Sequence, residues 1–493
     1  MSSSDTMRIP LAPTGVAIVM AAGWVATCNG FSPSRQSPPL PLPPLFSTAA
    51  GAADGVSIIS SASNAVVGEA DRSFRQGIQF ERFGLFRAAA ASFHEAATLY
   101  QCFLDQIQMT GEVHGNGAGS EVDGDGDGDG DGNANAFGHV TGLNPGEGPD
   151  SCTPVLAHAC MRLATLTHDA LGDSKAAARL YREAATIDPA PSSVAYDGMG
   201  TSIEASGGSL NDAADAYREA RRLDPRSAGA LFHLAVALER IGDVEKSEPL
   251  MDQLRRSEAR HSCLVDSWGY VRWHTRQEID ANLHRGTRSM LQIALAAALP
   301  MVKKERGVVC EFGVGSGRSL RMIQEILPLG TPIHGFDTFT GLPQPWGEEP
   351  AGAYSTGGVV PYMEGEVLFH RGLFADAIPA YLDTVRREEE EEEEEETRAG
   401  GKGVDDGDEA AYHPLAFAHV DCNLYGSTLD VLETLYSRIV PGTVIVFGQY
   451  LGHPTWRQDE FRAWREACKR FGWQYRYLGF SLSTMQAVVQ VTE

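Results

Sequence analysis

Glycines and hydroxyl side chains gather at the junction between a predicted strand and a predicted helix. Residues 308–312 are apolar and predict a buried strand, and the residues that follow place Leu320, Ile323 and Leu327 on one helix face. Glycines at such a junction allow a tight turn and let a bulky ligand approach the backbone. We therefore expect a cofactor to bind at this junction, through Glu311, Gly313, Gly315, Ser316, Gly317 and Ser319.

Asp337 ends the next predicted strand, residues 333–336, and follows Gly317 by twenty residues. A carboxylate at that place can accept hydrogen bonds from both hydroxyls of a ribose. The dinucleotide pattern GxGxxG does not fit, because Arg318 stands where the third glycine would be. The spacing Glu311-x-Gly-x-Gly-x-Gly317 resembles instead that of class I methyltransferases, which implies that S-adenosylmethionine binds with its amino-acid end near Glu311. The alternative is a glycine-rich turn that binds no ligand.

Four further segments, in order along the chain, resemble the macrocin O-methyltransferase family of sugar-tailoring enzymes. They are residues 334–343, 372–379, 419–428 and 440–450. The resemblance covers most of residues 262–493. It implies methyl transfer to a sugar or another small hydroxyl-bearing acceptor, although resemblance at this level does not identify the acceptor.

Several acids that this resemblance leads us to expect are replaced. Asp421 is present, but Asn423 stands where a second acid is usual, and Gly448 and Gln449 replace an acidic pair. Magnesium prefers hard carboxylate oxygens in an octahedral array, so Asp421 beside an amide makes a poor site. The sequence therefore predicts no metal site, or at most a weak one at Asp421.

Methyl transfer still needs an acceptor that is positioned and made nucleophilic. Asp421 can serve as the base, and so can His453, which lies in a loop before Trp456 and is expected to be open to solvent. His419 ends a buried strand, and we expect it to be a core residue. Trp346 and Trp456 either line the acceptor pocket or belong to the core.

Strand and helix signals alternate from residue 259 onward, which predicts a parallel sheet covered by helices on both faces. The later predicted elements are strands at 415–420 and 443–447, helices from 427 and near 459–470, and a hairpin of 475–480 with 486–491. We expect an α/β doubly wound, Rossmann-like methyltransferase domain over residues 259–493, interrupted by an acidic insert at 386–412.

A repeat with a spacing of 36 residues precedes that domain. Residues 177–181 in one copy correspond to 213–217 in the next, with alanine and tyrosine at matching places. Another copy has Met251 in the aromatic position, and an upstream one has Phe93. The pattern resembles the second half of a tetratricopeptide repeat, whose copies stack because each leaves an apolar face open. We expect an all-α repeat domain over residues 66–258 that recruits a protein partner or the acceptor.

The formal net charge of −25 is concentrated in two segments. Residues 111–150, which interrupt the repeats, carry nine acids and no Lys or Arg, and residues 388–410 carry thirteen acids against two basic residues. The rest is nearly neutral, which argues against a nucleic-acid partner. We expect both segments to be disordered, low-complexity inserts that are solvated and unpacked. A calcium loop from Asp123 is the alternative for the first, but its twelfth position is Ala134 where Glu is needed. The second could instead dock a basic partner.

The first 65 residues resemble a leader. An apolar centre at 16–28 suits a signal or organelle transit segment and is too short to predict a membrane span, while prolines at 39–44 favour a disordered leader as the alternative. The eight cysteines show no paired spacing, which indicates free thiols in a reducing compartment. We expect a cytoplasmic or organellar protein, with a secretory route left open.

Two functions compete on this sequence. In the first, the chain is an S-adenosylmethionine-dependent O-methyltransferase whose repeats recruit a partner or the acceptor. In the second, the repeats are the working surface of an interaction or scaffold protein, and the methyltransferase-like domain is catalytically impaired because its acids are replaced.

Overall fold

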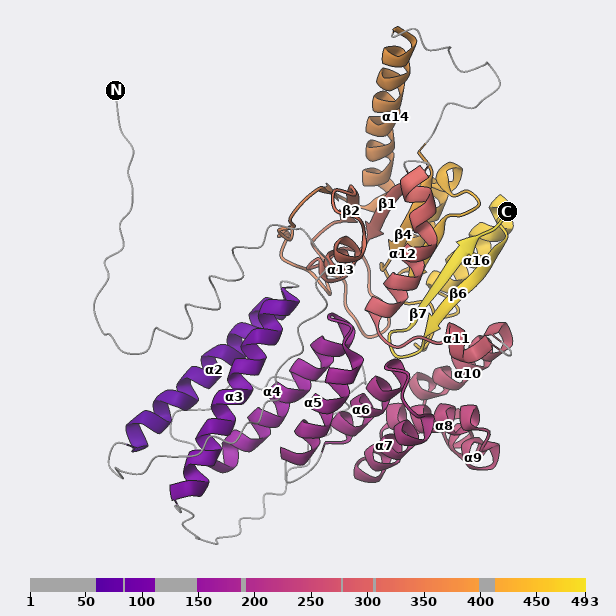
Figure 1. The fold of residues 1–493 in the computed structure, drawn as a ribbon. Coiled ribbons are helices and arrows are strands. Elements are labelled where there is room, and N and C mark those ends of the chain that lie inside the picture. The colour runs from indigo at the N-terminus through magenta and orange to yellow at the C-terminus, as the bar shows by residue number, and fades with distance from the viewer. Residues whose placement is uncertain are drawn as a thin grey trace, which may run out of the picture. The chain divides into compact units, whose positions relative to one another are not determined.

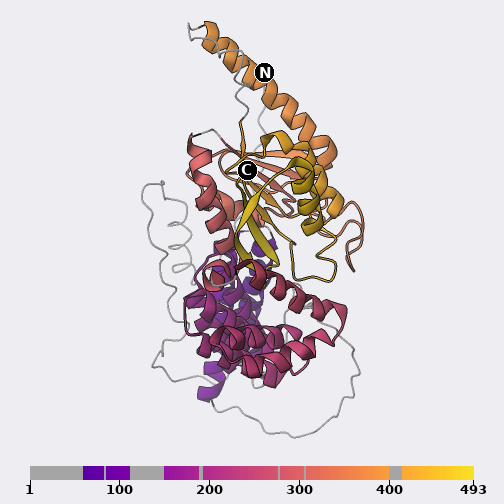
Figure 2. The same cartoon turned by 90° about the vertical axis from the view of Figure 1, so that its right-hand side faces the viewer.

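The computed structural model describes residues 59–82, 85–110, 149–187, 192–275, 278–304, 307–398 and 413–493. They form a helical repeat region that leads into an α/β domain (Figure 1, Figure 2). The apolar centre of the predicted leader, the Asp-Gly run that begins at Asp123 and the last part of the second acidic insert lie outside the described residues.

Consecutive helices build the repeat region. Their bounds are α2 (Ile59–Arg82), α3 (Phe86–Thr110), α4 (Pro149–Asp169), α5 (Ser174–Ile187), α6 (Ser193–Ala205), α7 (Leu210–Leu223), α8 (Ala228–Ile241) and α9 (Val244–Arg255). Each helix contacts the next along the chain. Since short connections make neighbouring helices antiparallel, the helices stack as hairpins, and the predicted solenoid of repeats is confirmed.

The repeated aromatic position fixes how closely these helices approach. Tyr181 of α5 and Tyr217 of α7 are buried against glycines of α6. A Cβ added to Gly198 would lie 2.5 Å from the Tyr181 ring, and one added to Gly200 would lie 2.5 Å from the Tyr217 ring. Phe93 of α3 is buried in the same way. The pattern of small and aromatic residues seen in the sequence is therefore a packing pattern.

Three helices connect the repeats to the sheet. They are α10 (Ala259–Thr275), α11 (Ile279–Asn282) and α12 (Thr287–Lys304). α10 packs on α8 and α9, and Trp268 Nε1 donates to a carboxylate oxygen of Glu239 in α8 at 2.7 Å. Tyr270 of the same helix contacts Trp456 and Tyr477 of the α/β domain. α10 therefore belongs to the packing of both regions.

A single sheet forms the centre of the α/β domain. Its strands are β1 (Val308–Phe312), β2 (Ile333–Asp337), β3 (Val367–Arg371), β4 (Leu415–Val420), β5 (Val444–Phe447), β6 (Tyr475–Ser481) and β7 (Gln486–Val491). Their order is β3-β2-β1-β4-β5-β7-β6, with β7 antiparallel to both of its neighbours and the other pairs parallel. The predicted parallel sheet and its closing hairpin are confirmed. The edge strand β3 had no sequence signal, because it is only partly buried.

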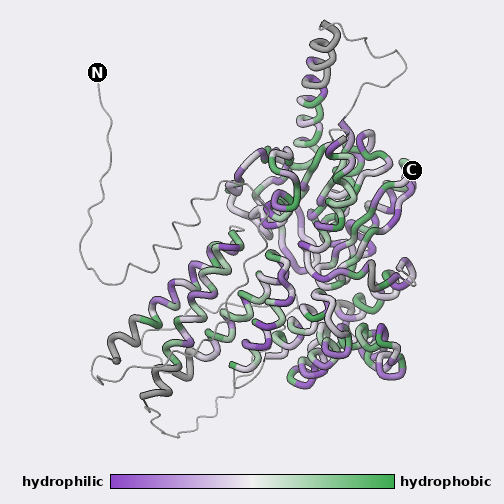
Figure 3. Tube along the Cα trace, in the orientation of Figure 1, coloured by the Kyte–Doolittle hydropathy of each residue, from purple (hydrophilic) through white to green (hydrophobic). Residues whose placement is uncertain are grey.

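Helices cover both faces of this sheet. The remaining helices are α13 (Arg318–Ile326), α14 (Phe374–Arg398), α15 (Tyr425–Thr434), the short η2 (Tyr436–Arg438) and α16 (Glu460–Phe471). On one face α12 contacts β4 to β7 and also α13; on the other, α14 contacts β2, β3 and α15, which in turn contacts α16. Hydrophobic residues run through the strands (Figure 3), and β4 and β5 are buried along their whole length. The doubly wound α/β class is confirmed.

The acidic run after residue 386 differs from the expectation. α14 continues through it to Arg398 and projects away from the sheet (Figure 1). The first half of α14 is held by buried Ile378 and Tyr381. Glutamate is a good helix former, so the packed half can extend into the run without further tertiary contacts.

Cys102, Cys160, Cys310, Cys422 and Cys468 are free thiols, as expected, and Cys310 and Cys422 are buried. Among the helices that the structure describes, none is long and apolar enough to cross a membrane.

Candidate functional site

Asp337 and the glycine loop hold each other at the carboxyl ends of β1 and β2. The Gly315 N–H donates to Asp337 Oδ2 at 2.7 Å, and the Phe339 N–H donates to Asp337 Oδ1 at 2.7 Å. Gly313 and Gly317 have φ angles of 91° and 79°, which glycine adopts without strain. Each carboxylate oxygen has a second lone pair, and Asp337 lines a cavity, so it retains capacity to accept further hydrogen bonds.

The ends of β1 and β4 approach so closely that residue 313 must be glycine. A Cβ added to Gly313 would lie 2.0 Å from the backbone oxygen of Asp421, whose N–H donates to Phe312 O at 2.9 Å. A Cβ added to Gly315 would meet no atom within 4 Å. In the sheet, β1 lies between β2 and β4, and the chain continues from β1 to β2. The order of the strands therefore reverses at β1, and ligands of open α/β sheets bind in the crevice at such a switch point.

Most, but not all, of the predicted cofactor residues line this cavity. Those that do are Gly313, Gly315, Ser316, Ser319 and Asp337. Gly317 is buried and is the N-cap residue of α13. Glu311 is fully buried behind the loop, so the direct cofactor contact suggested for it stays a prediction.

Glu311 and His419 form a buried pair beneath the loop. Glu311 Oε1 lies 2.7 Å from His419 Nδ1, and both side chains are inaccessible to solvent. Burial by itself would lower the pKa of His419, but the hydrogen bond and charge of Glu311, with Asp421 and Glu460 nearby, raise that pKa above its usual value. The expectation that His419 is a core residue agrees with this position.

Glu460, the first residue of α16, occupies the space beside the replaced acids. Its carboxylate accepts from the Asn423 N–H at 3.2 Å and from the Gln449 N–H at 2.7 Å. Burial, followed by the negative charge of Asp421, raises the pKa of Glu460 to about 8, although these backbone hydrogen bonds act in the opposite direction. Asn423 has a φ of 64°, a conformation that asparagine tolerates better than most residues. Glu460 therefore fixes the backbone of two loops whose side chains are no longer acidic.

Asp421 lines the cavity where β4 ends, next to Gly448. A Cβ added to Gly448 would lie 2.1 Å from Asp421 Oδ1, so the Asp421 carboxylate uses the space that a side chain at residue 448 would need. The side chain of Gln449 also lines the cavity, and its Oε1 is a buried oxygen without a hydrogen-bond partner in the described part of the chain.

His453 lies on the cavity wall but is buried, at 7% exposure, where an open position was expected. Its Nε2 lies 3.0 Å from Gln449 O, which can only accept, so Nε2 carries the proton. Burial lowers the pKa of His453 against the opposing effects of the Gln449 carbonyl and Asp459. The neutral ring therefore leaves the lone pair on Nδ1.

The two tryptophans occupy different environments, one on the cavity wall and one in the core. Trp346 lines the cavity, its Nε1 donates to Asp459 Oδ2 at 3.1 Å, and its ring contacts His453. Trp456 is 2% exposed and packs against Tyr270, so it belongs to the core.

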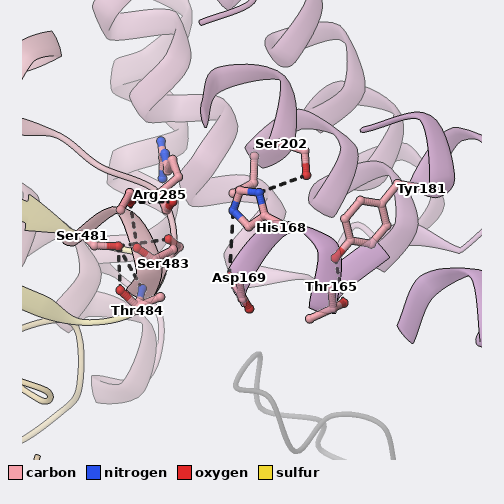
Figure 4. A network of polar contacts seen from close by, with 12 residues as sticks. Thr165, His168, Asp169, Tyr181, Ser202, Arg285, Ser481, Ser483 and Thr484 are labelled. Atoms are coloured by element: carbon pink, nitrogen blue, oxygen red, sulfur yellow. Dashed lines mark hydrogen bonds and ion pairs between the residues drawn. The ribbon is translucent and has the colours of Figure 1, made fainter. Parts of the chain in front are cut away.

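The cavity extends from the loop to the repeats and has a volume of about 2280 Å³. Its repeat side includes Thr165 and His168 of α4, Tyr181 of α5 and Ser202 of α6. Figure 4 shows the His168 ring between Ser202 and Asp169, beside the hydrogen bond that joins Thr165 Oγ1 and Tyr181 Oη at 2.8 Å. The site is therefore built from both regions of the chain.

Magnesium does not fit this arrangement. Of the four positions at which the family resemblance implies acids, only residue 421 is acidic, and Glu460 is bound to backbone N–H groups. Within the described ranges, no group of three or more His, Cys, Asp and Glu side chains could hold a metal ion. One carboxylate beside an amide is a poor donor set for magnesium, and the absence of a strong metal site stays a prediction.

Sequence reasoning missed Glu460 and the contribution of the repeats to the cavity wall. The only local signal for Glu460 is an acid in the first turn of a predicted helix, a common feature of helix starts. The repeats gave a packing pattern but no indication of which helices face the sheet.

Comparisons with known proteins agree with both regions. Residues 404–470 match the model of the macrocin O-methyltransferase family, and residues 204–260 match a tetratricopeptide repeat model. No curated protein matches the sequence significantly.

Solved structures with similarity to this chain include methyltransferases. A calicheamicin methyltransferase shares 18% identity over 50% of this chain and 92% of its own, with a TM-score of 0.29. The O-methyltransferase NovP shares 19% identity over 42% and 81%, with a TM-score of 0.29. An O-methyltransferase from Bacillus cereus, solved in complex with SAH, shares 13% identity over 50% and 96%, with a TM-score of 0.24. The chain thus combines tetratricopeptide repeats with a class I methyltransferase-like domain that resembles the macrocin O-methyltransferase family.

Proposed function

We propose that this chain is an S-adenosylmethionine-dependent O-methyltransferase that works without a bound metal ion. The observation that carries the proposal is the hydrogen bond from the Gly315 N–H to Asp337 Oδ2, at the switch point of the sheet and open to the cavity. It joins the glycine loop to Asp337, the acid that we propose binds the ribose, and a nucleoside-bearing cofactor needs both elements.

The residues present fit this cofactor. The free lone pairs of Asp337 would accept the ribose hydroxyls, and the open face of Gly315 would let the cofactor lie against the loop. Ser316 and Ser319, at the start of α13, offer hydroxyl groups on the same wall. When bound, S-adenosylmethionine supplies a methyl group on an activated sulfonium.

Asp421, His453 and Gln449 would act on the acceptor. Rotation of the Gln449 side chain into the cavity would bring its buried, unpartnered Oε1 to an acceptor hydroxyl, which it would orient by accepting a hydrogen bond. Neutral His453 can take up the hydroxyl proton on Nδ1, and the Asp459 carboxylate, whose Oδ2 lies 3.9 Å from Nδ1, favours the imidazolium that results. Asp421, on the same wall, can serve as the base in its place. No acid at residue 423, 448 or 449 is needed for this division of roles.

Calorimetric titration of the full chain with S-adenosylmethionine tests the proposal. We expect saturable binding that is unchanged by added magnesium and is weakened at least about tenfold, or 1.4 kcal/mol, by Asp337→Ala. Asp383→Asn, on the exposed side of α14, is the matched control and should bind as the wild type does. Absence of binding at millimolar cofactor would refute the enzyme and favour the scaffold function. An unchanged affinity in Asp337→Ala would refute the cofactor position.

A further inference from the structure

The repeat side of the cavity is acidic, and this bears on what the cavity accepts. Four acids, Asp169, Asp197, Asp224 and Glu258, line this side of the cavity against one arginine, Arg226. The α/β side of the same cavity adds Arg318 and five acids, Asp337, Glu348, Glu349, Asp421 and Asp430. Arg318 is paired with Asp169 at 3.6 Å, so its charge is already matched within the chain. The cavity therefore presents a negative potential to an incoming ligand.

The cavity is also too large for a cofactor and a small acceptor alone. Sites for small ligands have volumes of roughly 300 to 1,000 Å³, whereas this one has about 2280 Å³. Its additional length lies along α4, α6 and α8, the first helices of successive repeats. Stacked helical repeats offer extended concave surfaces of this kind to extended ligands.

Unused binding groups line this repeat side. His168 is buried, it lines the cavity, and its Nε2 has no hydrogen-bond partner within the described residues. Val194 of α6 is 49% exposed on the same wall, and Tyr354 is 52% exposed on the loop opposite. A ring nitrogen that has no hydrogen bond to any described residue and lies 4.0 Å from Asp169 Oδ1, together with exposed apolar groups, suits a ligand with both polar and apolar parts, such as a polypeptide.

Buried contacts fix this wall relative to the glycine loop. Arg285, which precedes α12, pairs with Glu204 of α6 at 3.1 Å, and both side chains are only 3% exposed. Arg288 Nη1 donates to Ala170 O at 2.8 Å. Because these contacts hold the repeats against the α/β domain, a ligand on the wall would lie at a fixed position relative to Asp421 and the loop.

We propose that the repeat wall binds a basic polypeptide segment and that this segment carries the acceptor hydroxyl. The inference rests on the proposed function and names the substrate class that it leaves open. Lys and Arg side chains of the segment would meet Asp197, Asp224 and Glu258, and the chain's own acidic inserts are excluded because they carry the same sign as the cavity. A side-chain hydroxyl of the segment would bond to the methyl carbon and give its proton to His453, while the bond between the sulfur and that carbon breaks.

The test measures fluorescence anisotropy of a labelled, degenerate library of 15-residue peptides, with Arg at every third position and Ser, Thr and Tyr among the others. An equivalent library with Glu in place of Arg is the charge control. We expect the full chain to bind the basic library, with affinity that falls as salt rises. Asp197→Asn with Asp224→Asn should weaken this binding about tenfold. Asp212→Asn with Asp215→Asn, the same change on exposed positions of α7 outside the cavity, should leave it unchanged.

Several results would overturn the inference. They are the absence of binding of the basic library at low salt, equal binding of both libraries, and equal losses in the two double variants. Full displacement of the peptides by argininamide at a concentration equal to that of the peptides would also overturn it, because a single arginine would then bind as well as a polypeptide. Titration of the same proteins with S-adenosylmethionine keeps the two proposals apart. Peptide binding that depends on Asp197 and Asp224 in a chain that binds no S-adenosylmethionine would support the peptide wall and overturn the proposed function.

Discussion

Two alanine substitutions in one loop distinguish a structural glycine from a ligand-facing one. Gly313 and Gly315 both have positive φ angles, 91° and 53°, so alanine at either place is strained by about 1 to 2 kcal/mol. Their surroundings differ. At 313 the new methyl group would lie 2.0 Å from Asp421 O, and at 315 it would meet nothing within 4 Å.

The additional cost at Gly313 follows from what the methyl group meets. The Asp421 carbonyl is main chain at the end of β4, and the Asp421 N–H is bonded to Phe312 O. Relief of the overlap therefore requires the ends of β1 and β4 to separate, an overpacking cost of about 1 to 3 kcal/mol. We expect Gly313→Ala to destabilise the protein by about 2 to 5 kcal/mol and Gly315→Ala by only about 1 to 2 kcal/mol.

Urea unfolding of each variant, followed by calorimetric titration with S-adenosylmethionine, measures both consequences. Gly315→Ala should stay folded yet lose at least about tenfold in affinity, because its methyl group enters the cavity. If the two variants lost equal stability, the close approach of β1 and β4 would be wrong. If Gly315→Ala kept full affinity, the cofactor would not lie against this loop.

Buried carboxylates provide further predictions. Glu204→Gln leaves Arg285 buried without its counter-ion and should cost about 3 to 5 kcal/mol in urea unfolding, whereas Glu219→Gln, at an exposed pair, should cost less than about 1 kcal/mol. Burial raises the pKa of Glu204, but the charges of Arg285 and Arg240 outweigh burial and lower that pKa to about 2. The contribution of Glu204 to the stability of the fold is therefore complete above about pH 4.5 and is lost as the pH falls towards 2. Thermal unfolding of wild type and Glu204→Gln across that range should converge at the acid end, and parallel curves would contradict the assignment. Glu460 has the opposite sign: its pKa of about 8 means that stability falls as the pH rises from about 4.5 to 8, and Glu460→Gln should flatten that slope whatever its absolute stability.

The elements that the sequence predicts well have local signals. β1 and β4 are mostly apolar runs that end at Gly313 and Asp421, and the structure places them at the predicted residues. The alanine and tyrosine pattern of the repeats likewise reports contacts between helices that are neighbours in the chain. Asp337 follows from its distance to the glycine loop, because strand, loop and next strand form one compact unit.

The properties that escaped prediction depend on residues distant in the chain. His453 was expected to be open because it lies in a loop before Trp456, but Trp346, about a hundred residues earlier, packs against its ring. The edge strand β3 lacks a buried face to produce alternation. Composition could not predict the acidic lining of the cavity, because the acids of the repeats and those of the sheet domain are distant in the chain. They lie together only in the folded protein, where the pair of Arg285 and Glu204 holds the two regions against each other.

The replaced acids and Glu460 are best understood together. Carboxylates at 423, 448 and 449 would lie beside Asp421 and Glu460, and without a divalent cation such like charges repel each other strongly. In this chain two of the positions contribute backbone N–H groups to Glu460 instead, and the third gives its space to Asp421. One buried acid, Glu460, thereby orders both loops. The replacements that remove the acids of a metal site are therefore the same ones that allow the site to keep its shape without a metal ion.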